Sequence, residues 1–154
     1  MKKLFLIPAL ILLSNCLFAQ GKSNEKPLYD AALAKKLNGN EYGMKKYVIA
    51  FLKAGPNRGQ DSATAAQLQA AHMANIHRMA EAGDLVVAGP FMDDGELRGI
   101  YIFNVETVEK AKELTETDPA VKAGRLVMEL HPWYSSAALM EVNGIHKKIQ
   151  KKSH

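Results

Sequence analysis

One histidine of this chain, His72, lies where its residue type and spacing could support acid–base chemistry. Over residues 63–82, small and apolar side chains recur at the spacing of one helix face, and His72 is near its middle. A buried imidazole needs hydrogen-bond partners, because an unpartnered polar group is costly to desolvate. A carboxylate on one ring nitrogen would fix the tautomer and make the other nitrogen more basic. His72 is therefore a candidate general base or acid, and the alternative is a histidine that is simply satisfied within the core.

The surrounding pattern predicts an α+β fold of the ferredoxin-like type, with an antiparallel four-stranded sheet in the order β-α-β-β-α-β. We expect strands near residues 45–52, 85–92, 97–105 and 125–133, and helices near 63–82 and 107–115. Asp61 is a good residue to cap the first of these helices, and Gly83 a good residue to end it. The sequence Asp93-Asp94-Gly95 is a hairpin turn signal between two strands.

The first three predicted strands are apolar on both faces. Two helices can cover only one face of such a sheet, so the other face needs a second cover. The simplest cover is the same sheet of another copy, and we therefore predict a homodimer packed face to face.

Four features together resemble the YCII-related family (YciI-like proteins): His72, the segment GDLVVAGP at 83–90, the segment DPAVKAG at 118–124, and a closing aromatic strand that ends at Trp133. The resemblance covers about residues 45–135 and implies a dimeric α+β barrel. It also implies that a histidine at the position of His72 pairs with an aspartate as an acid–base dyad. Asp118 is the candidate partner, although an aspartate before Pro119 is also a routine helix cap. Asp93 and Asp94 are alternative partners.

Gly89, Pro90, Phe91 and Trp133 are the candidate substrate-binding residues. A proline within a strand predicts an edge or a bulge, and the strand aromatics either fill the core or line an apolar pocket. By analogy with families that share the barrel, we expect an acid–base step of isomerase, lyase or dehydrohalogenase type on a small organic molecule, catalysed by His72 and Asp118. The alternative is a non-catalytic ligand-binding or structural dimer, so the sequence leaves open whether the protein is an enzyme.

The sequence contains no glycine-rich phosphate loop, nucleophile elbow or CxxC pair, and we expect no metal and no organic cofactor. His72 and His77 are about 140° apart around a helix, so they cannot share a metal ion. A metal site formed by His72, His131 and Glu129 is a weaker alternative. The net charge of +4 falls to +2 without Lys2 and Lys3, which is too small a bias to predict nucleic-acid binding.

Residues 1–19 have the features of a signal peptide. Lys2 and Lys3 precede an apolar run, Leu4 to Leu13, that is too short to span a bilayer comfortably. Cleavage after Ala19 would release a periplasmic or secreted protein without cysteine. This protein would consist of a linker at 20–43, the domain at 44–135 and a solvated basic tail at 136–154. The alternative is a lipoprotein anchored through Cys16, the only case in which we expect a membrane partner.

Overall fold

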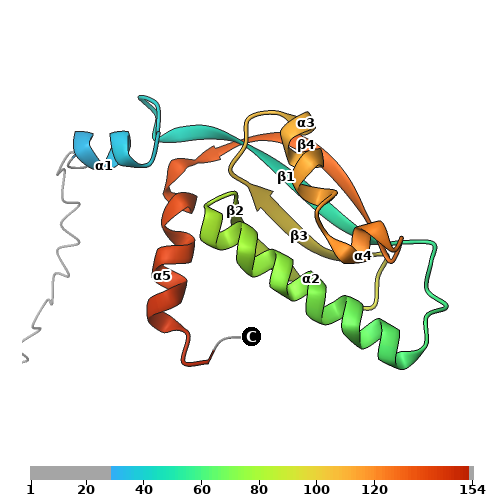
Figure 1. The fold of residues 1–154 in the computed structure, drawn as a ribbon. Helices are drawn as coiled ribbons and strands as arrows, with labels where there is room; N and C mark the ends of the chain where they lie inside the picture. The colour runs from blue at the N-terminus through green and yellow to red at the C-terminus, as the bar shows by residue number, and fades with distance from the viewer. Residues whose placement is uncertain (1–28, 153–154) are drawn as a thin grey trace, which may run out of the picture.

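The structure is a computed structural model that describes residues 29–152. Its antiparallel sheet has the spatial order β2-β3-β1-β4 and consists of β1 (Met44–Ala54), β2 (Leu85–Pro90), β3 (Leu97–Phe103) and β4 (Leu126–Ser136). The long helix α2 (Ser62–Ala82) connects β1 to β2 (Figure 1). Two shorter helices, α3 (Val108–Thr115) and α4 (Pro119–Lys122), lie between β3 and β4. The predicted α+β fold with its β-α-β-β-α-β order is confirmed.

Local signals in the sequence set both ends of α2. The carboxylate of Asp61 accepts a hydrogen bond from the backbone N–H of Thr64 at 2.9 Å, which satisfies an otherwise free amide of the first turn. Gly83 ends the helix in the left-handed conformation, with φ at +81°. Glycine adopts this conformation at little cost because it has no Cβ. The chain can therefore turn directly from α2 into β2.

The helices cover one face of the sheet. Val48, Ala50 and Leu52 of β1 pack with Met79 of α2 and Ala111 of α3 in the main core cluster. The residues of β1 between them point to the other face, as the two-residue period of a strand requires. There a second cluster forms around Tyr47, Val86 and Ile102. The sheet is thus apolar on both faces, as the sequence indicated.

The segment after β4 is folded, which the sequence does not predict, and its basic end at residues 146–152 is exposed, as expected of a solvated tail. It forms a 3-10 turn, η1 (Ala137–Glu141), and a helix, α5 (Val142–Ile149), that lies beside β2 (Figure 1). Leu139 and Met140 of η1 pack against the second cluster and cover one end of that sheet face. Asn143 donates a hydrogen bond from Nδ2 to the carbonyl oxygen of Leu85 at 2.8 Å, which fastens α5 to β2. The apolar contacts of η1 and the side-chain amide of Asn143 thus anchor this segment to the sheet.

The N-terminal part of the described chain holds the short helix α1 (Ala31–Lys36), which is capped by Asp30 and lies within the segment predicted as a linker. The predicted signal peptide, with its alternative lipidation at Cys16, lies outside the described residues. Within residues 29–152, no helix is both long and apolar enough to cross a membrane.

We expect Gly83→Ala to lower the free energy of unfolding by about 1 kcal/mol, because an L-residue in the left-handed conformation costs roughly 1–2 kcal/mol. A Cβ at this position would meet no atom within 4 Å, so the effect reports conformation alone. Urea unfolding monitored by circular dichroism measures the change. Gly59→Ala is the matched control, since Gly59 also has open space and lacks a left-handed backbone. Equal effects of the two substitutions would contradict this explanation.

Candidate active site

His72 and Asp118 form a buried hydrogen-bonded pair. Nδ1 of His72 lies 2.7 Å from Oδ2 of Asp118. His72 is 8% exposed and Asp118 is completely buried. A carboxylate can only accept a hydrogen bond, so Nδ1 carries the hydrogen and the lone pair of the neutral ring lies on Nε2. The pair therefore has the orientation that an acid–base histidine requires.

Asp118 uses each of its carboxylate oxygens for a different purpose. Oδ1 accepts from the backbone N–H of Ala120 at 2.8 Å and so caps the first turn of α4, while Oδ2 holds His72. The sequence allowed two roles for Asp118, a helix cap or a histidine partner. In the structure the one side chain performs both. Asp93 and Asp94, the alternative partners, are exposed in the segment between β2 and β3.

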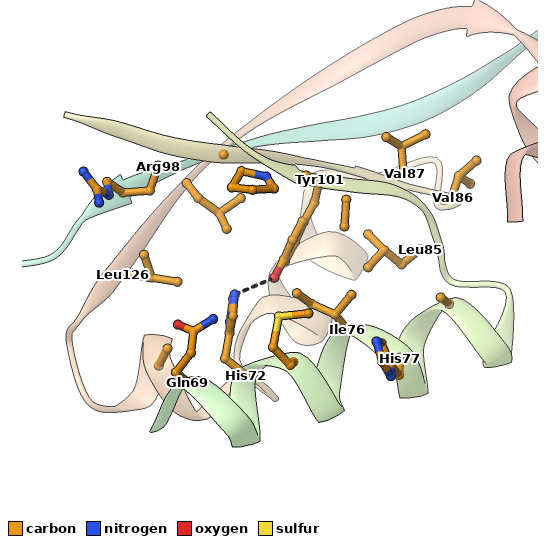
Figure 2. A pocket seen from close by; sticks show the side chains of 18 of the residues that line it. Gln69, His72, Ile76, His77, Leu85, Val86, Val87, Arg98, Tyr101 and Leu126 are labelled. Atoms are coloured by element: carbon orange, nitrogen blue, oxygen red, sulfur yellow. Dashed lines mark hydrogen bonds between the residues drawn. The ribbon is translucent and has the colours of Figure 1, made fainter. Parts of the chain in front are cut away.

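Tyr101 of β3 completes the hydrogen bonding of the imidazole. Its hydroxyl lies 3.3 Å from Nε2 of His72, and the two rings are nearly parallel (Figure 2). Burial raises the pKa of the Tyr101 hydroxyl well above its ordinary value, and the charge of Asp118 adds to this effect. Tyr101 therefore keeps its proton and donates a hydrogen bond to Nε2. In the sequence Tyr101 is only one of several strand aromatics, and its role depends on how β3 lies over α2.

A second set of hydrogen bonds holds the two elements of the pair together. Arg78 donates from Nη2 to Oδ1 of Asn75 at 2.8 Å and to Oγ1 of Thr117 at 2.9 Å. Oγ1 of Thr117 also lies 3.1 Å from Oδ1 of Asn75. Asn75 follows His72 by one helical turn, and Thr117 immediately precedes Asp118. This network therefore fixes α2 against the start of α4 at the point where the pair forms.

The imidazole lies on the wall of a cavity of about 730 Å³. The cavity runs along α2 and is bounded by β2, by parts of β3 and by α5; His72 and Tyr101 both line it (Figure 2). Its wall is mostly apolar, with contributions from Leu52, Leu68, Met73, Ile76, Leu85, Val86, Val87, Pro90 and Leu126. A cavity of this size and character is typical of a site for a small organic ligand.

Two of the four predicted substrate-binding residues, Gly89 and Pro90 on the edge strand β2, line this cavity. Phe91 follows β2, is 41% exposed and is not part of the cavity wall. Trp133 lies on the opposite sheet face, where its ring packs against Tyr47 at 6.2 Å between centroids. The register pairs Trp133 with Tyr47, and both point away from the helices. The structure thus separates Trp133 from His72.

His77 also lines this cavity, which the sequence did not predict. The helical period places it on the side of α2 opposite to His72, yet it lines the far end of the same cavity. The reason is α5, which contributes Val142, His146 and Lys147 to the wall and extends the cavity around the helix. Since the sequence did not predict α5, it could not predict this end of the cavity.

The metal site considered from the sequence is not assembled. Glu129 pairs with Phe51 across the strands, so Glu129 and His131 lie on the sheet face opposite to His72. They bond to each other at 2.7 Å, and Lys53 bonds to Glu129 at 2.6 Å. These hydrogen bonds, from Lys53 first and His131 second, hold the pKa of Glu129 below its ordinary value. Within the part of the chain that the structure describes, no group of three or more His, Cys, Asp or Glu side chains could hold a metal ion.

We expect Asp118→Asn to change the tautomer of His72, because the amide nitrogen of asparagine donates a hydrogen bond where the carboxylate accepted one. The amide oxygen can still accept from Ala120, so α4 keeps its cap. The ¹⁵N chemical shifts of the neutral ring measure the effect: the hydrogen should lie on Nδ1 in the wild type and on Nε2 in the variant. His131, on the other sheet face, is the internal control. The same tautomer in both proteins would contradict the assignment.

The family model of the YCII-related domain matches residues 45–134, which is more than half of the chain. One solved structure that matches is the 5-chloro-2-hydroxyhydroquinone dehydrochlorinase (TftG) from Burkholderia phenoliruptrix AC1100, in complex with 2,5-dihydroxybenzoquinone. The match has 21% sequence identity and a TM-score of 0.43, and it covers 58% of this chain and 93% of that chain.

At this identity and TM-score, the structural match says nothing about the substrate of this chain. No curated protein was found to be similar in sequence. The family model covers both His72 and Asp118 and all four strands except the outermost residues of β1 and β4. The chain therefore belongs to the YCII-related domain family.

Proposed function

We propose that the protein binds a small organic molecule in the cavity beside α2, and that His72, oriented by Asp118, moves a proton on that molecule. The main support is the position of the imidazole between two environments. Nδ1 is held by a fully buried carboxylate, while the same ring lines a cavity large enough for a ligand. Gly89 and Pro90 form part of the ligand-facing wall. A fixed tautomer that faces a cavity is the arrangement of a general base.

The proposed step starts at the lone pair of Nε2. A ligand with an acidic C–H or O–H displaces the 3.3 Å hydrogen bond of Tyr101 and transfers its proton to Nε2. The ligand keeps the electron pair of the broken bond, and Asp118 stabilises the imidazolium that forms. The Tyr101 hydroxyl is then free to donate to the ligand anion. Return of the proton to another atom gives an isomerisation, whereas loss of a leaving group such as halide from the anion gives an elimination. No metal or organic cofactor enters either route.

A non-catalytic ligand-binding or structural role is the second candidate function. One observation favours it: Tyr101 already satisfies Nε2, so both ring nitrogens of His72 have partners. Among the described residues, no buried side-chain nitrogen or oxygen lacks a hydrogen-bond partner. A histidine retained only for stability would show the same pattern. The two functions differ in what happens when the imidazole is removed.

We expect His72→Gln to reduce turnover by at least about 100-fold, the lower end of what general acid–base catalysis contributes. The assay follows small phenols and organic acids in D₂O by ¹H NMR, which detects deuterium incorporation, isomerisation and loss of a leaving group. His131→Gln is the matched control, because His131 lies on the other sheet face, and it should react like the wild type. Undiminished turnover in His72→Gln would exclude the acid–base role. Binding without turnover in the wild type would favour the second function.

We also propose that two copies pair through the open part of the sheet face opposite to the helices. Leu139 and Met140 cover only the end of this face near Trp133. Ile49, Phe51 and Ile100 are only partly buried there, and Val127 is 47% exposed. These apolar side chains lie beside the charged cluster of Lys53, Glu129 and His131 and remain open in one chain, which favours a partner of the same kind. The residue pattern at 1–19 supports export as part of the proposal, with cleavage after Ala19 or, alternatively, lipid attachment at Cys16.

We expect Val127→Lys to convert the dimer to a monomer, because each copy would bury a lysine charge in the paired faces, where it loses its hydration. A lysine at this exposed position is compatible with the folded monomer, so the variant should keep its unfolding midpoint in dilute solution. Sedimentation equilibrium measures the mass. Met92→Lys is the control, since Met92 is apolar, 96% exposed and in the segment between β2 and β3. A monomeric wild type would refute the pairing.

A further inference from the structure

One end of the cavity is lined by arginines. Three of the four arginines in the chain, Arg58, Arg98 and Arg125, belong to the cavity wall. They come from three different segments: the loop after β1, the start of β3 and the residue before β4. The strand register brings these segments together, because Lys53 pairs with Leu97 and Ala54 pairs with Leu126. In Figure 2, Arg98 lies at one end of the cavity and His77 at the other, with His72 between them.

Arg58 and Arg98 are exposed and Arg125 is half-buried, and each of the three guanidinium groups has an uncharged hydrogen-bond partner. Arg58 donates from Nη1 to the carbonyl oxygen of Arg125 at 3.2 Å, and Arg98 donates to the carbonyl oxygen of Gly95 at 3.3 Å. Arg125 donates to the side-chain oxygen of Gln60. Each of these acceptors is uncharged. Within residues 29–152, none of the ion pairs involves any of these three arginines.

The loop that contains Arg58 is itself fastened to the segment before β4. Backbone hydrogen bonds join Gly55 to Arg125 at 2.8 Å and Asn57 to Gly124 at 3.0 Å. The Asn57 side chain adds a bond to the carbonyl oxygen of Ala123 at 3.2 Å. These bonds fix the backbone of the loop next to the segment before β4, which lowers the entropy cost of binding an anion between Arg58 and Arg125.

The charge along the cavity is strongly unbalanced. Besides the three arginines, Lys147 of α5 lies on the wall, whereas Glu81 is the single carboxylate among the lining residues of the described chain. Asp61, near the arginine end in sequence, is not a lining residue, and its carboxylate is engaged by Thr64 at the start of α2. The wall between the arginines and His72 includes Leu52, Leu68 and Leu126. The cavity therefore combines an apolar middle with a cationic end.

On the basis of the proposed function, we infer that the ligand is an organic acid, whose carboxylate binds Arg58, Arg98 and Arg125 and whose apolar body reaches His72. Guanidinium groups match the two oxygens of a carboxylate in geometry and in charge. The apolar lining suits a ring or short chain better than a sugar or a polyol. The ligand would then bind in one orientation, with its carboxylate at the arginine end and its reacting atom at the imidazole of His72.

Isothermal titration calorimetry with two probes of the same shape tests the inference. The probes are 2-naphthoate, which carries the carboxylate, and 2-naphthamide, its neutral counterpart. We expect the wild type to bind naphthoate at least about tenfold more tightly than naphthamide, which corresponds to about 1.4 kcal/mol. Arg98→Gln and Arg125→Gln should each remove most of this preference while leaving naphthamide binding unchanged. Added salt should weaken the binding of naphthoate alone.

Lys35→Gln is the control variant, because it removes one positive charge from α1, outside the cavity wall. It should bind both probes like the wild type, and circular dichroism confirms that each arginine variant is folded. Equal binding of the two probes, or a preference that survives both arginine substitutions, would overturn the organic-acid assignment and leave the proposed ligand cavity intact. Binding of neither probe to the wild type would overturn the ligand cavity as well.

Discussion

The site depends on the hydrogen bond between Nδ1 of His72 and Oδ2 of Asp118, because a completely buried carboxylate must have its oxygens satisfied. Loss of the imidazole would leave an uncompensated buried charge, and loss of the carboxylate would leave a buried ring without its acceptor. The partners are 46 residues apart, so the bond also fixes α2 against α4. Asp118 also caps α4 by accepting from the backbone N–H of Ala120, and the contacts of Arg78 with Asn75 and Thr117 hold the two helices together.

The same bond gives the two ring nitrogens of His72 different surroundings. Asp118 faces the protein interior and is fully buried, whereas the ring of His72 lies on the cavity wall with Tyr101 at its other nitrogen. Burial keeps Tyr101 protonated by raising its pKa. The three side chains therefore form a chain in which hydrogen is donated from His72 to Asp118 and from Tyr101 to His72. In this arrangement Nε2 of His72 is the basic nitrogen available to a ligand in the cavity. The Tyr101 hydroxyl can then donate a hydrogen bond to a ligand that has become an anion.

The elements that hold this pair are predictable because their signals are local. Helical period, the cap at Asp61 and the stop at Gly83 define α2, and the Asp-Pro sequence marks the start of α4. Tyr101 and α5 were missed for different reasons: the first depends on the register of β3, and the second is held by few contacts outside its own helix. The position of Trp133, in contrast, could have been predicted from the two-residue period of a strand. Leu126, Met128 and Leu130 are the helix-facing residues of β4, so the odd-numbered residue 133 must point to the other sheet face.

Binding and proton transfer use separate parts of this molecule. The pair of His72 and Asp118 is fixed by the packing of α2 on α4, and none of its hydrogen bonds involves α5 or the three arginines of the cavity end. The arginines lie within the family match at residues 45–134, whereas α5 lies beyond it and closes the opposite end. A change at either end can therefore alter which ligand fits while the imidazole keeps its tautomer. In this fold, the acid–base pair keeps its position and hydrogen bonds, while the residues at the two ends of the cavity can change and select a different ligand.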